Sequence, residues 1–264
     1  MNCYHLSMKT DERHRLIGEL LRAQGDVTVD ELTEACDASG ATIRRDLEVL
    51  AAHGVLRRVH GGAKSLIVRG ENPGYGQREL EDQGIKVRIA AAVAGLLRDR
   101  ERVWLDSGTT ATEIARTLRG RELTLMPMSL RSLNAVTADD QNAGQRPALL
   151  LPGGSVVPGE LCFRGPLAET NIRSLRFDTA VVTPCALNLK DGLLAHDLED
   201  AAVKRAGLES AGRVIVACAG PKWDANAMAL VAALDSVDVI VTEKNLSADQ
   251  LAQLNKLSVE VVNV

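Results

Sequence analysis

The sequence predicts an α/β protein of two domains, an N-terminal winged helix-turn-helix domain followed by a larger α/β domain. Three observations support this fold class. Short amphipathic helices lie close together near the start of the chain, a basic hairpin pattern follows them, and apolar strands alternate with helices from residue 85 onward. The expected boundaries are 9–68 for the first domain, 69–84 for a linker and 85–264 for the second domain.

Two helices are predicted at the start of the first domain. The first has an apolar face and ends near Gly25; this face consists of Leu16, Ile17, Leu20 and Leu21. In the second, Val29, Leu32 and Cys36 repeat at helical spacing after Thr28, whose hydroxyl can cap a helix start. Residues 1–7 precede a natural start at Met8 and are expected to be either a flexible extension of this domain or the result of a mis-assigned start.

A third helix is predicted between Ser39, a capping residue, and Gly54, which can take a positive φ at a helix end. Only residues 37–38 separate this helix from the second one, and its outer face carries Arg44 and Arg45. Two short helices joined by so tight a turn form a helix-turn-helix, which places side chains in the major groove of DNA. The alternative is that the two arginines form an ordinary solvated helix face.

A basic hairpin is predicted directly after the third helix. Residues 55–63 alternate apolar and basic side chains and then reach a Gly61-Gly62 turn, the pattern of a β-hairpin wing. The candidate DNA-binding residues of the helix and the wing are Ser39, Thr42, Arg44, Arg45, Arg57, Arg58 and His60.

These motifs together resemble the winged-helix signature of DeoR-type bacterial transcription regulators. The resemblance rests on the string Thr-Ile-Arg-Arg-Asp-Leu at 42–47, followed by Gly54, Arg58 and His-Gly-Gly-Ala at 60–63. It implies that Thr42, Arg44 and Arg45 lie on the recognition helix and that Arg58 and His60 lie on the wing. The implied partner is a double-stranded DNA operator.

Charge and composition constrain this hypothesis. Residues 1–63 hold eight Lys/Arg and ten Asp/Glu, and the whole chain has a net charge of −4, so any basic DNA-binding surface must be local. We therefore expect a homo-oligomer, dimer or tetramer, in which paired subunits bind two half-sites. The longest apolar run has nine residues, too few to span a membrane. The five cysteines are scattered, as expected of buried thiols in a cytoplasmic protein. We expect no metal site and no cofactor.

The second domain is predicted to contain a largely parallel sheet with helices on its faces. Continuous apolar runs such as residues 214–217 and 239–241 are typical of strands buried on both faces. The expected strands are 102–105, 122–126, 148–151, 179–183, 213–218, 237–242 and 259–264, and the expected helices are 85–99, 110–118, 198–211 and 247–255.

One loop of this domain has the composition of a phosphate-binding site. The strand at 102–105 runs into Asp106-Ser-Gly-Thr-Thr110 and then into a helix. Gly108 permits close backbone approach, Ser107, Thr109 and Thr110 supply hydroxyls, and the helix start offers free N–H groups. The alternative is a helix cap without a ligand.

Further candidates follow other strands of the sheet: Gly153, Gly154, Glu199, Lys204 and Lys222. Their order along the chain, after Asp-Ser-Gly-Thr-Thr, resembles the DeoR-type sensor domain. That domain is similar in fold to ribose-phosphate isomerases and coenzyme A transferases and senses phosphorylated metabolites. The resemblance implies an effector pocket lined by Asp106, Gly108, Thr109, Thr110 and Lys204.

Two segments depart from the family pattern. Pro127-Met128-Ser129 stands where the family has Thr-Asn-Ser, and Ala219-Gly220-Pro221-Lys222 stands where it tends to have Asp-Ser-Ser-Lys. Polar groups that could hold sugar hydroxyls are therefore replaced, whereas the phosphate loop is retained.

The leading functional hypothesis is a transcription regulator, expected to be a repressor of carbohydrate or related metabolism, controlled by a phosphorylated metabolite. The alternative is a phosphosugar isomerase or deaminase with a DNA-binding appendage. An enzyme would need a general base near the phosphate loop, for which Asp106, Asp197 and Glu199 are candidates, but no acid–base pair emerges from the sequence. A ligand-independent DNA-binding protein is a third possibility.

Overall fold

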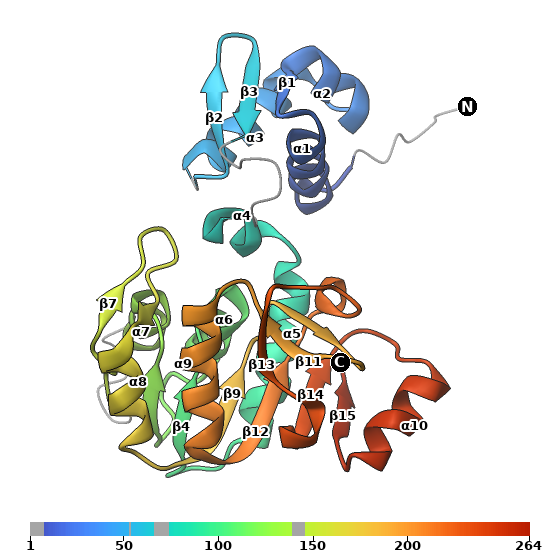
Figure 1. Ribbon diagram of the computed structural model, residues 1–264. Coiled ribbons are helices and arrows are strands. Elements are labelled where there is room, and N and C mark those ends of the chain that lie inside the picture. The colour runs from blue at the N-terminus through green and yellow to red at the C-terminus, as the bar shows by residue number, and fades with distance from the viewer. Residues whose placement is uncertain (1–7, 53, 66–73, 139–145) are drawn as a thin grey trace. The chain divides into compact units, whose positions relative to one another are not determined.

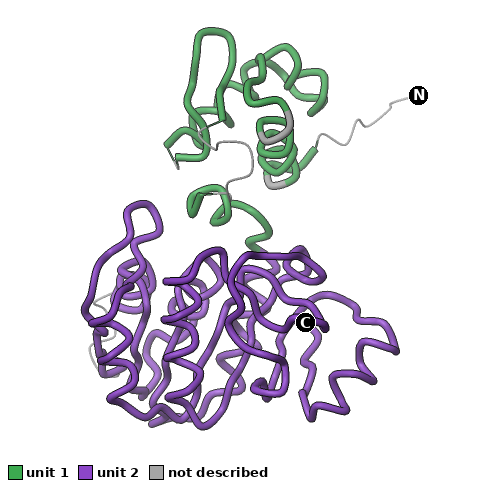
Figure 2. The backbone as a smooth tube through the Cα atoms, viewed as in Figure 1, with its two compact units in different colours: residues 1–83 green, residues 84–264 purple. Residues whose placement is uncertain are grey.

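The computed structural model describes residues 8–52, 54–65, 74–138 and 146–264. The chain divides into two compact units, Met1–Gln83 and Gly84–Val264 (Figure 2). The expected extension at 1–7 and the part of the expected linker at 69–73 lie outside the described residues. Among the described residues, no helix combines the length and apolar character needed to cross a membrane.

The first unit contains the predicted winged helix-turn-helix. Its helices are α1 (Thr10–Gln24), α2 (Val29–Cys36) and α3 (Gly40–Ala52), and its strands are β1 (Asp26–Thr28), β2 (Leu56–Val59) and β3 (Gly62–Ser65). The strands form an antiparallel sheet of order β1-β3-β2, in which β2 and β3 form the wing (Figure 1). The helices share one apolar core that includes Ile17, Leu32, Ile43, Leu47 and Leu50.

The predicted caps define the helix-turn-helix. The Thr28 hydroxyl accepts a hydrogen bond from the Glu31 backbone N–H, and the Ser39 hydroxyl accepts one from the Thr42 N–H. Asp37 ends α2 in the left-handed region with φ 46°. This conformation turns the chain sharply, so that the three residues 37–39 suffice to connect the helices.

A short helix, α4 (Tyr75–Leu80), lies within the segment expected to be a linker. Tyr75 and Gln77 are buried, and Gln77 lies against Gly18 of α1. The expectation of a linker throughout 69–84 was therefore wrong for these residues. One helical turn and a half is too short for a hydrophobic period to appear in the sequence.

The second unit is built on a seven-stranded parallel sheet of order β15-β14-β12-β9-β4-β5-β6. Each strand was predicted: β4 (Arg102–Leu105), β5 (Thr124–Pro127), β6 (Ala148–Leu149), β9 (Phe177–Val182), β12 (Ala211–Ala217), β14 (Val239–Thr242) and β15 (Glu260–Asn263). The four predicted helices are confirmed as α5 (Gln83–Leu96), α6 (Thr109–Thr117), α9 (Leu198–Glu209) and α10 (Ala248–Lys256).

Several short elements were not predicted. They are the helices α7 (Leu130–Thr137) and α8 (Pro166–Arg173), the hairpin β7 (Ser155–Val156) and β8 (Phe163–Arg164), and the strands β10 (Ala186–Asn188), β11 (Gly192–Ala195) and β13 (Ala229–Ala232). The last three form a separate antiparallel sheet of order β10-β11-β13. Alternation cannot identify strands of two to four residues, and the parallel strands of that length were predicted from their apolar runs instead.

The parallel sheet separates two apolar cores. Along β12, Val214 and Val216 belong to one core, and Ile215 and Ala217 belong to the other. The first core is covered by α8, α9 and α10, and the second by α5, α6 and α7 (Figure 1). This two-sided burial explains why the central strands are continuously apolar.

Trp104 of β4 is fully buried against α9, where Gly207 permits the closest contact. A Cβ atom at Gly207 would lie 2.6 Å from the Trp104 ring. A side chain at position 207 would therefore force the helix or the ring to move.

We expect Gly207→Ala to destabilise the protein by about 1–3 kcal/mol, because overpacking outweighs the gain of about 0.5–1 kcal/mol from removing a helical glycine. Urea unfolding followed by circular dichroism measures the change. Gly95→Ala in α5 is the matched control, since nothing lies within 4 Å of its Cβ position, and it should be neutral or stabilising. Equal effects of the two substitutions would contradict this packing argument.

Candidate functional site

The outer face of α3 carries the two predicted arginines. Arg44 and Arg45 are exposed, whereas Ile43 and Leu47 on either side of them are buried in the core. Thr42 is half-buried, and its hydroxyl lies 2.8 Å from that of Ser39. Ser39 therefore serves as a helix cap, and the guanidinium groups of Arg44 and Arg45 project from the helix surface.

A buried carboxylate fixes the orientation of α3. Asp46 accepts hydrogen bonds from Arg13 Nε at 2.6 Å and from Arg13 Nη2 at 3.1 Å, and His14 Nε2 lies 3.1 Å from its Oδ1 atom. All three side chains are buried. The hydrogen bond from Arg13 to the Asp46 carboxylate raises the pKa of the Arg13 guanidinium. Asp46 thus joins α3 to α1, a role that the sequence analysis did not identify.

The wing presents further basic side chains. Arg57, Arg58 and His60 are exposed, and Lys64 is paired with Arg57 across β2 and β3. Arg58 Nη1 donates a 2.9 Å hydrogen bond to Glu48 on α3. Lys64 was not among the predicted residues, although the strand register places it beside Arg57, a predicted DNA-binding residue. The Arg58–Glu48 pair, which joins the wing to the recognition helix, was not predicted either.

The strand order of the second unit indicates where a ligand would bind. From β4, the chain first adds β5 and β6 on one side and then β9, β12, β14 and β15 on the other. The order therefore reverses between β4 and β9. In open α/β sheets, ligands bind beyond the carboxyl ends of the strands at such a reversal.

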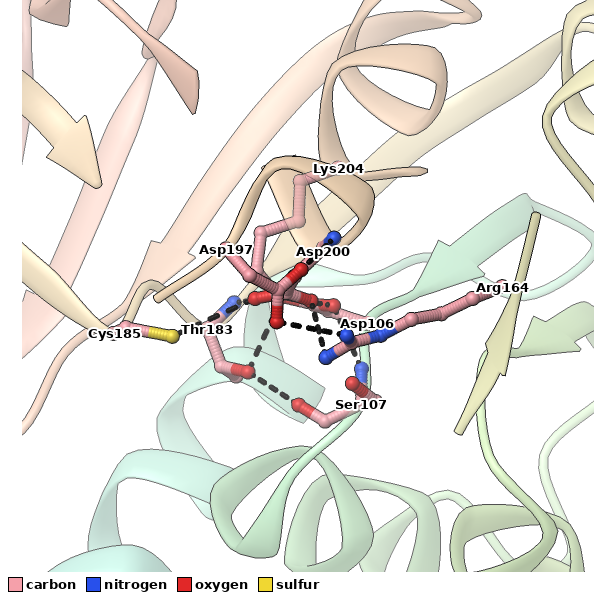
Figure 3. A network of polar contacts seen from close by, with 8 residues as sticks. All are labelled: Asp106, Ser107, Arg164, Thr183, Cys185, Asp197, Asp200 and Lys204. Atoms are coloured by element: carbon pink, nitrogen blue, oxygen red, sulfur yellow. Dashed lines mark hydrogen bonds and ion pairs between the residues drawn. The ribbon is translucent and has the colours of Figure 1, made fainter. Parts of the chain in front are cut away.

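Asp106 follows β4 at this point of the sheet and is almost completely buried. Its carboxylate accepts a hydrogen bond from Ser107 N at 2.7 Å and another from Thr183 N, just after β9, at 2.9 Å (Figure 3). The Thr183 hydroxyl also donates to the Ser107 carbonyl oxygen at 2.6 Å. These bonds connect the two strands at which the order reverses.

Lys204 of α9 forms a buried ion pair with Asp106. Its ammonium lies 2.8 and 2.7 Å from the two Asp106 oxygens and 3.3 Å from Asp200, and its side chain is only 2% exposed. Burial lowers the pKa of Lys204, and the carboxylates of Asp106 and Asp200 more than compensate, so that the net shift is upward. Three acceptors surround the three N–H donors of this ammonium.

Asp200 extends the network towards β8 and β9 (Figure 3). Arg164, at the end of β8, lies 3.8 Å from Asp200 and donates a 2.8 Å hydrogen bond from Nη1 to Asp197. Asp197 also caps α9 through the Asp200 N–H. Burial of the Cys185 side chain, whose Sγ lies 3.5 Å from Asp200, raises the pKa of its thiol.

The predicted phosphate loop starts α6. Gly108 has φ 105°, in the left-handed region that favours glycine, and no side chain among the described residues caps this helix start. Ser107 and Thr109 are half-buried, and Thr110 is buried. The first N–H groups of α6 are therefore available to an anion.

The other predicted residues of the effector site differ in their positions. Gly154 has a positive φ, and a Cβ there would collide with the Arg164 carbonyl oxygen. This glycine therefore allows the close backbone approach in the β7–β8 hairpin. Gly153 beside it also has a positive φ. Lys222 follows β12, and its charge acts on the Cys185 thiol. Glu199 is exposed in the first turn of α9, outside the network; the acidic residue that meets Lys204 is Asp200, four positions earlier on the same helix face.

In the two segments that depart from the family pattern, the apolar replacements are buried. Met128 and Ala219 are both buried. A carboxylate from the neighbouring strand end, Glu243, accepts a 2.6 Å hydrogen bond from the Gly220 N–H. A Cβ at position 220 would lie 2.7 Å from Glu243 Oε1, so a side chain there would require the Glu243 carboxylate to move. Glu243 was not among the residues predicted from the sequence.

Replacing Lys204 by methionine should destabilise the protein by about 3–5 kcal/mol, because Asp106 and Asp200 would keep their negative charges without a buried cation. Urea unfolding measures this loss. In the double variant Asp106→Asn/Lys204→Met part of the stability should return, since one of the unpaired charges is gone. A single variant as stable as the wild type would show that the pair contributes nothing to the fold.

Comparison with known proteins identifies both units. Residues 13–67 match the DeoR-like helix-turn-helix domain, and residues 81–244 match the DeoR C terminal sensor domain. A solved structure of ribose 5-phosphate isomerase A from Methanocaldococcus jannaschii aligns with 54% of this chain and 55% of its own, at 13% identity and a TM-score of 0.38.

Similar proteins extend along almost the whole chain. The transcriptional repressor AccR of Agrobacterium fabrum is 34% identical over 89% of this chain and 90% of its own length. The glycerol-3-phosphate regulon repressor of Haemophilus influenzae is 31% identical over the same shares of the two chains. Both relatives are regulators, which decides against the enzyme hypothesis. The two family matches and these relatives together show that the chain belongs to the DeoR family of helix-turn-helix transcription regulators.

Proposed function

We propose that this regulator is a cytoplasmic repressor that binds an operator as a homo-oligomer and changes its operator affinity when a phosphorylated metabolite binds its second unit. The observation that carries the proposal is the uncapped start of α6 at Gly108, beside Asp106 at the reversal of strand order. A phosphate group is the ligand that free helix N–H groups and a close glycine backbone favour.

The proposed DNA contacts divide into two kinds. Arg44 and Arg45 project from the recognition helix and are assigned to base edges in the major groove, where arginine binds guanine through two hydrogen bonds. Arg57, Arg58 and His60 on the wing are assigned to phosphates, which position the protein without reading sequence. Without DNA, Glu48 partly neutralises Arg58, so the phosphate contact has to compete with this exposed pair.

We expect Arg44→Ala and Arg45→Ala each to weaken operator binding by about 1–3 kcal/mol, because each removes a contact to a base edge. Arg58→Ala should instead weaken binding to all duplexes nearly alike and reduce the salt dependence. Gel-shift titrations of operator and of random duplex DNA at several salt concentrations distinguish the two behaviours. Equal operator affinity for the wild type and the Arg44→Ala/Arg45→Ala double variant would refute the assignment.

The oligomer is supported by the modest basic surface of one winged helix and by apolar side chains on the second unit. Leu198 of α9, Leu230 of β13 and the neighbouring Met228 are 68%, 55% and 75% exposed. Exposed apolar side chains on elements that pack together are typical of surfaces buried between subunits. Two winged helices in one assembly would bind two half-sites with a raised effective concentration.

The geometry refines the roles of the predicted effector residues. Asp106 and Lys204 neutralise each other, so we assign them to holding the loop at 107–110 in place rather than to direct contact with a phosphate. The direct donors are the backbone N–H groups at the start of α6 and the hydroxyls of Ser107 and Thr109. The name of the Haemophilus relative makes glycerol 3-phosphate one of the first compounds to test.

Gly108→Val should abolish the response to a phosphorylated effector, because a side chain at φ 105° is strained and blocks close approach of the phosphate to the backbone. A thermal-shift screen of glycerol 3-phosphate and sugar phosphates, each beside its dephosphorylated form, finds the ligand, and calorimetry compares the variants. Thr109→Ala should weaken binding by removing one hydroxyl. Ligand-free operator binding is the control and should be unchanged. Equal binding of the phosphorylated and dephosphorylated forms would contradict the proposed phosphate site.

A further inference from the structure

Residues 107–110 of the proposed phosphate site include no cation, and Lys204 cannot supply one. The donors at the loop are backbone N–H groups and hydroxyls, and the nearest charged group, Asp106, is negative. The Lys204 ammonium has three N–H bonds, and its three near neighbours are the two Asp106 oxygens and one Asp200 oxygen. None of its donors is left for a ligand.

Arg164 differs from Lys204 in this respect. Its guanidinium has five N–H donors, of which Nη1 donates to Asp197 at 2.8 Å. Its Nη2 lies 3.8 Å from the nearest Asp200 oxygen, which is longer than a hydrogen bond, and among the described residues no partner accepts from Nε. Its side chain is 15% exposed, more than the 2% of Lys204.

Arg164 is also aimed at the loop. In Figure 3 its guanidinium points towards Asp106 and Ser107, on the side of the network away from Cys185. Ion pairs and hydrogen bonds connect it to the loop through Asp200 and Lys204, and then through Asp106, which accepts from the Ser107 N–H. The position of Arg164 is itself fixed, because it ends β8 and its carbonyl oxygen contacts Gly154.

The charge of the network favours a role for this arginine in anion binding. Two cations, Arg164 and Lys204, face three carboxylates, Asp106, Asp197 and Asp200, so the network holds one negative charge in excess. A phosphate placed beside it would be repelled unless a cation with free donors turned towards it. The planar guanidinium fork binds two phosphate oxygens at once, which a lysine cannot do.

We propose that Arg164 is the cation that binds the phosphate group of the effector, together with the N–H groups at the start of α6. This inference rests on the proposed effector function and names the positively charged partner of the same site. The ligand class is a phosphate monoester small enough to place its phosphate between residues 107–110 and Arg164.

The test uses the full-length protein with two probes, inorganic phosphate and glycerol 3-phosphate, measured by calorimetry and by the shift of the unfolding temperature. Arg164→Gln should weaken binding of both probes about ten- to a hundredfold, because charge-assisted hydrogen bonds are lost. Arg164→Lys should recover part of the affinity, since it restores the charge but not the fork. The matched control is Arg173→Met, which removes an arginine paired with Glu209 on the surface of α8 and should bind both probes like the wild type.

The outcomes separate this inference from the proposed function. If Gly108→Val loses phosphate binding while Arg164→Gln and Arg164→Lys bind like the wild type, the loop binds phosphate and the role of Arg164 is refuted. If the wild type binds neither probe, the phosphate site and the role of Arg164 are both refuted. The unfolding temperature without ligand is measured for each variant, and an Arg164→Lys variant that folds like the wild type but binds no better than Arg164→Gln would contradict a direct contact between the Arg164 charge and the phosphate.

Discussion

The arrangement of the loops at the carboxyl ends of β4 and β9 depends on the buried ion pair between Lys204 and Asp106. This pair joins α9 to the end of β4, and the hydrogen bonds of Asp106 to Ser107 and Thr183 connect this point to the loop before α6 and to β9. Two charges removed from water are costly unless their geometry satisfies nearly every donor and acceptor. Here the ammonium has three acceptors, and the carboxylate accepts from two backbone N–H groups as well. We infer that the pair is retained because it fixes the geometry of the loop, since apolar side chains of similar volume would hold the helix to the sheet equally well.

In the winged helix, a buried carboxylate bound to a cation likewise fixes the position of the recognition helix α3. Asp46 points from α3 into the core and is held by Arg13 of α1, while Arg44 and Arg45, directly before it, face outward. A rotation of α3 would break two hydrogen bonds to a buried carboxylate. The orientation of the arginines is therefore determined by a residue that cannot contact DNA. In both units a buried carboxylate bound to a cation sets the position of the residues proposed to bind the ligand.

Much of this architecture follows from local patterns in the sequence. The caps at Thr28 and Ser39, the hairpin at Gly61-Gly62 and the seven strands of the parallel sheet were predicted because each is encoded by a short stretch of residues. The partners of the charged side chains were not, because Asp106 and Lys204 are 98 positions apart and Arg13 and Asp46 are 33 apart. Residue type alone indicated that Lys204 could neutralise a phosphate; only the fold brings two carboxylates around it. Glu199 was favoured over Asp200 for a similar reason, since the helix phase decides which of two adjacent acidic residues faces inward.

Through the same network, binding of an anion could change the contacts of α9 in the second unit. Asp197 both caps α9 and accepts a hydrogen bond from Arg164, so a guanidinium that turned towards a phosphate would weaken one bond at the start of the helix that carries Lys204. Asp197 would then lose its guanidinium partner, and Lys204 would be the cation left beside Asp200. A ligand shifts a conformational equilibrium only through contacts that differ between the two states. A cation shared between α9 and the ligand supplies such a difference, which a phosphate held by rigid backbone N–H groups alone would not.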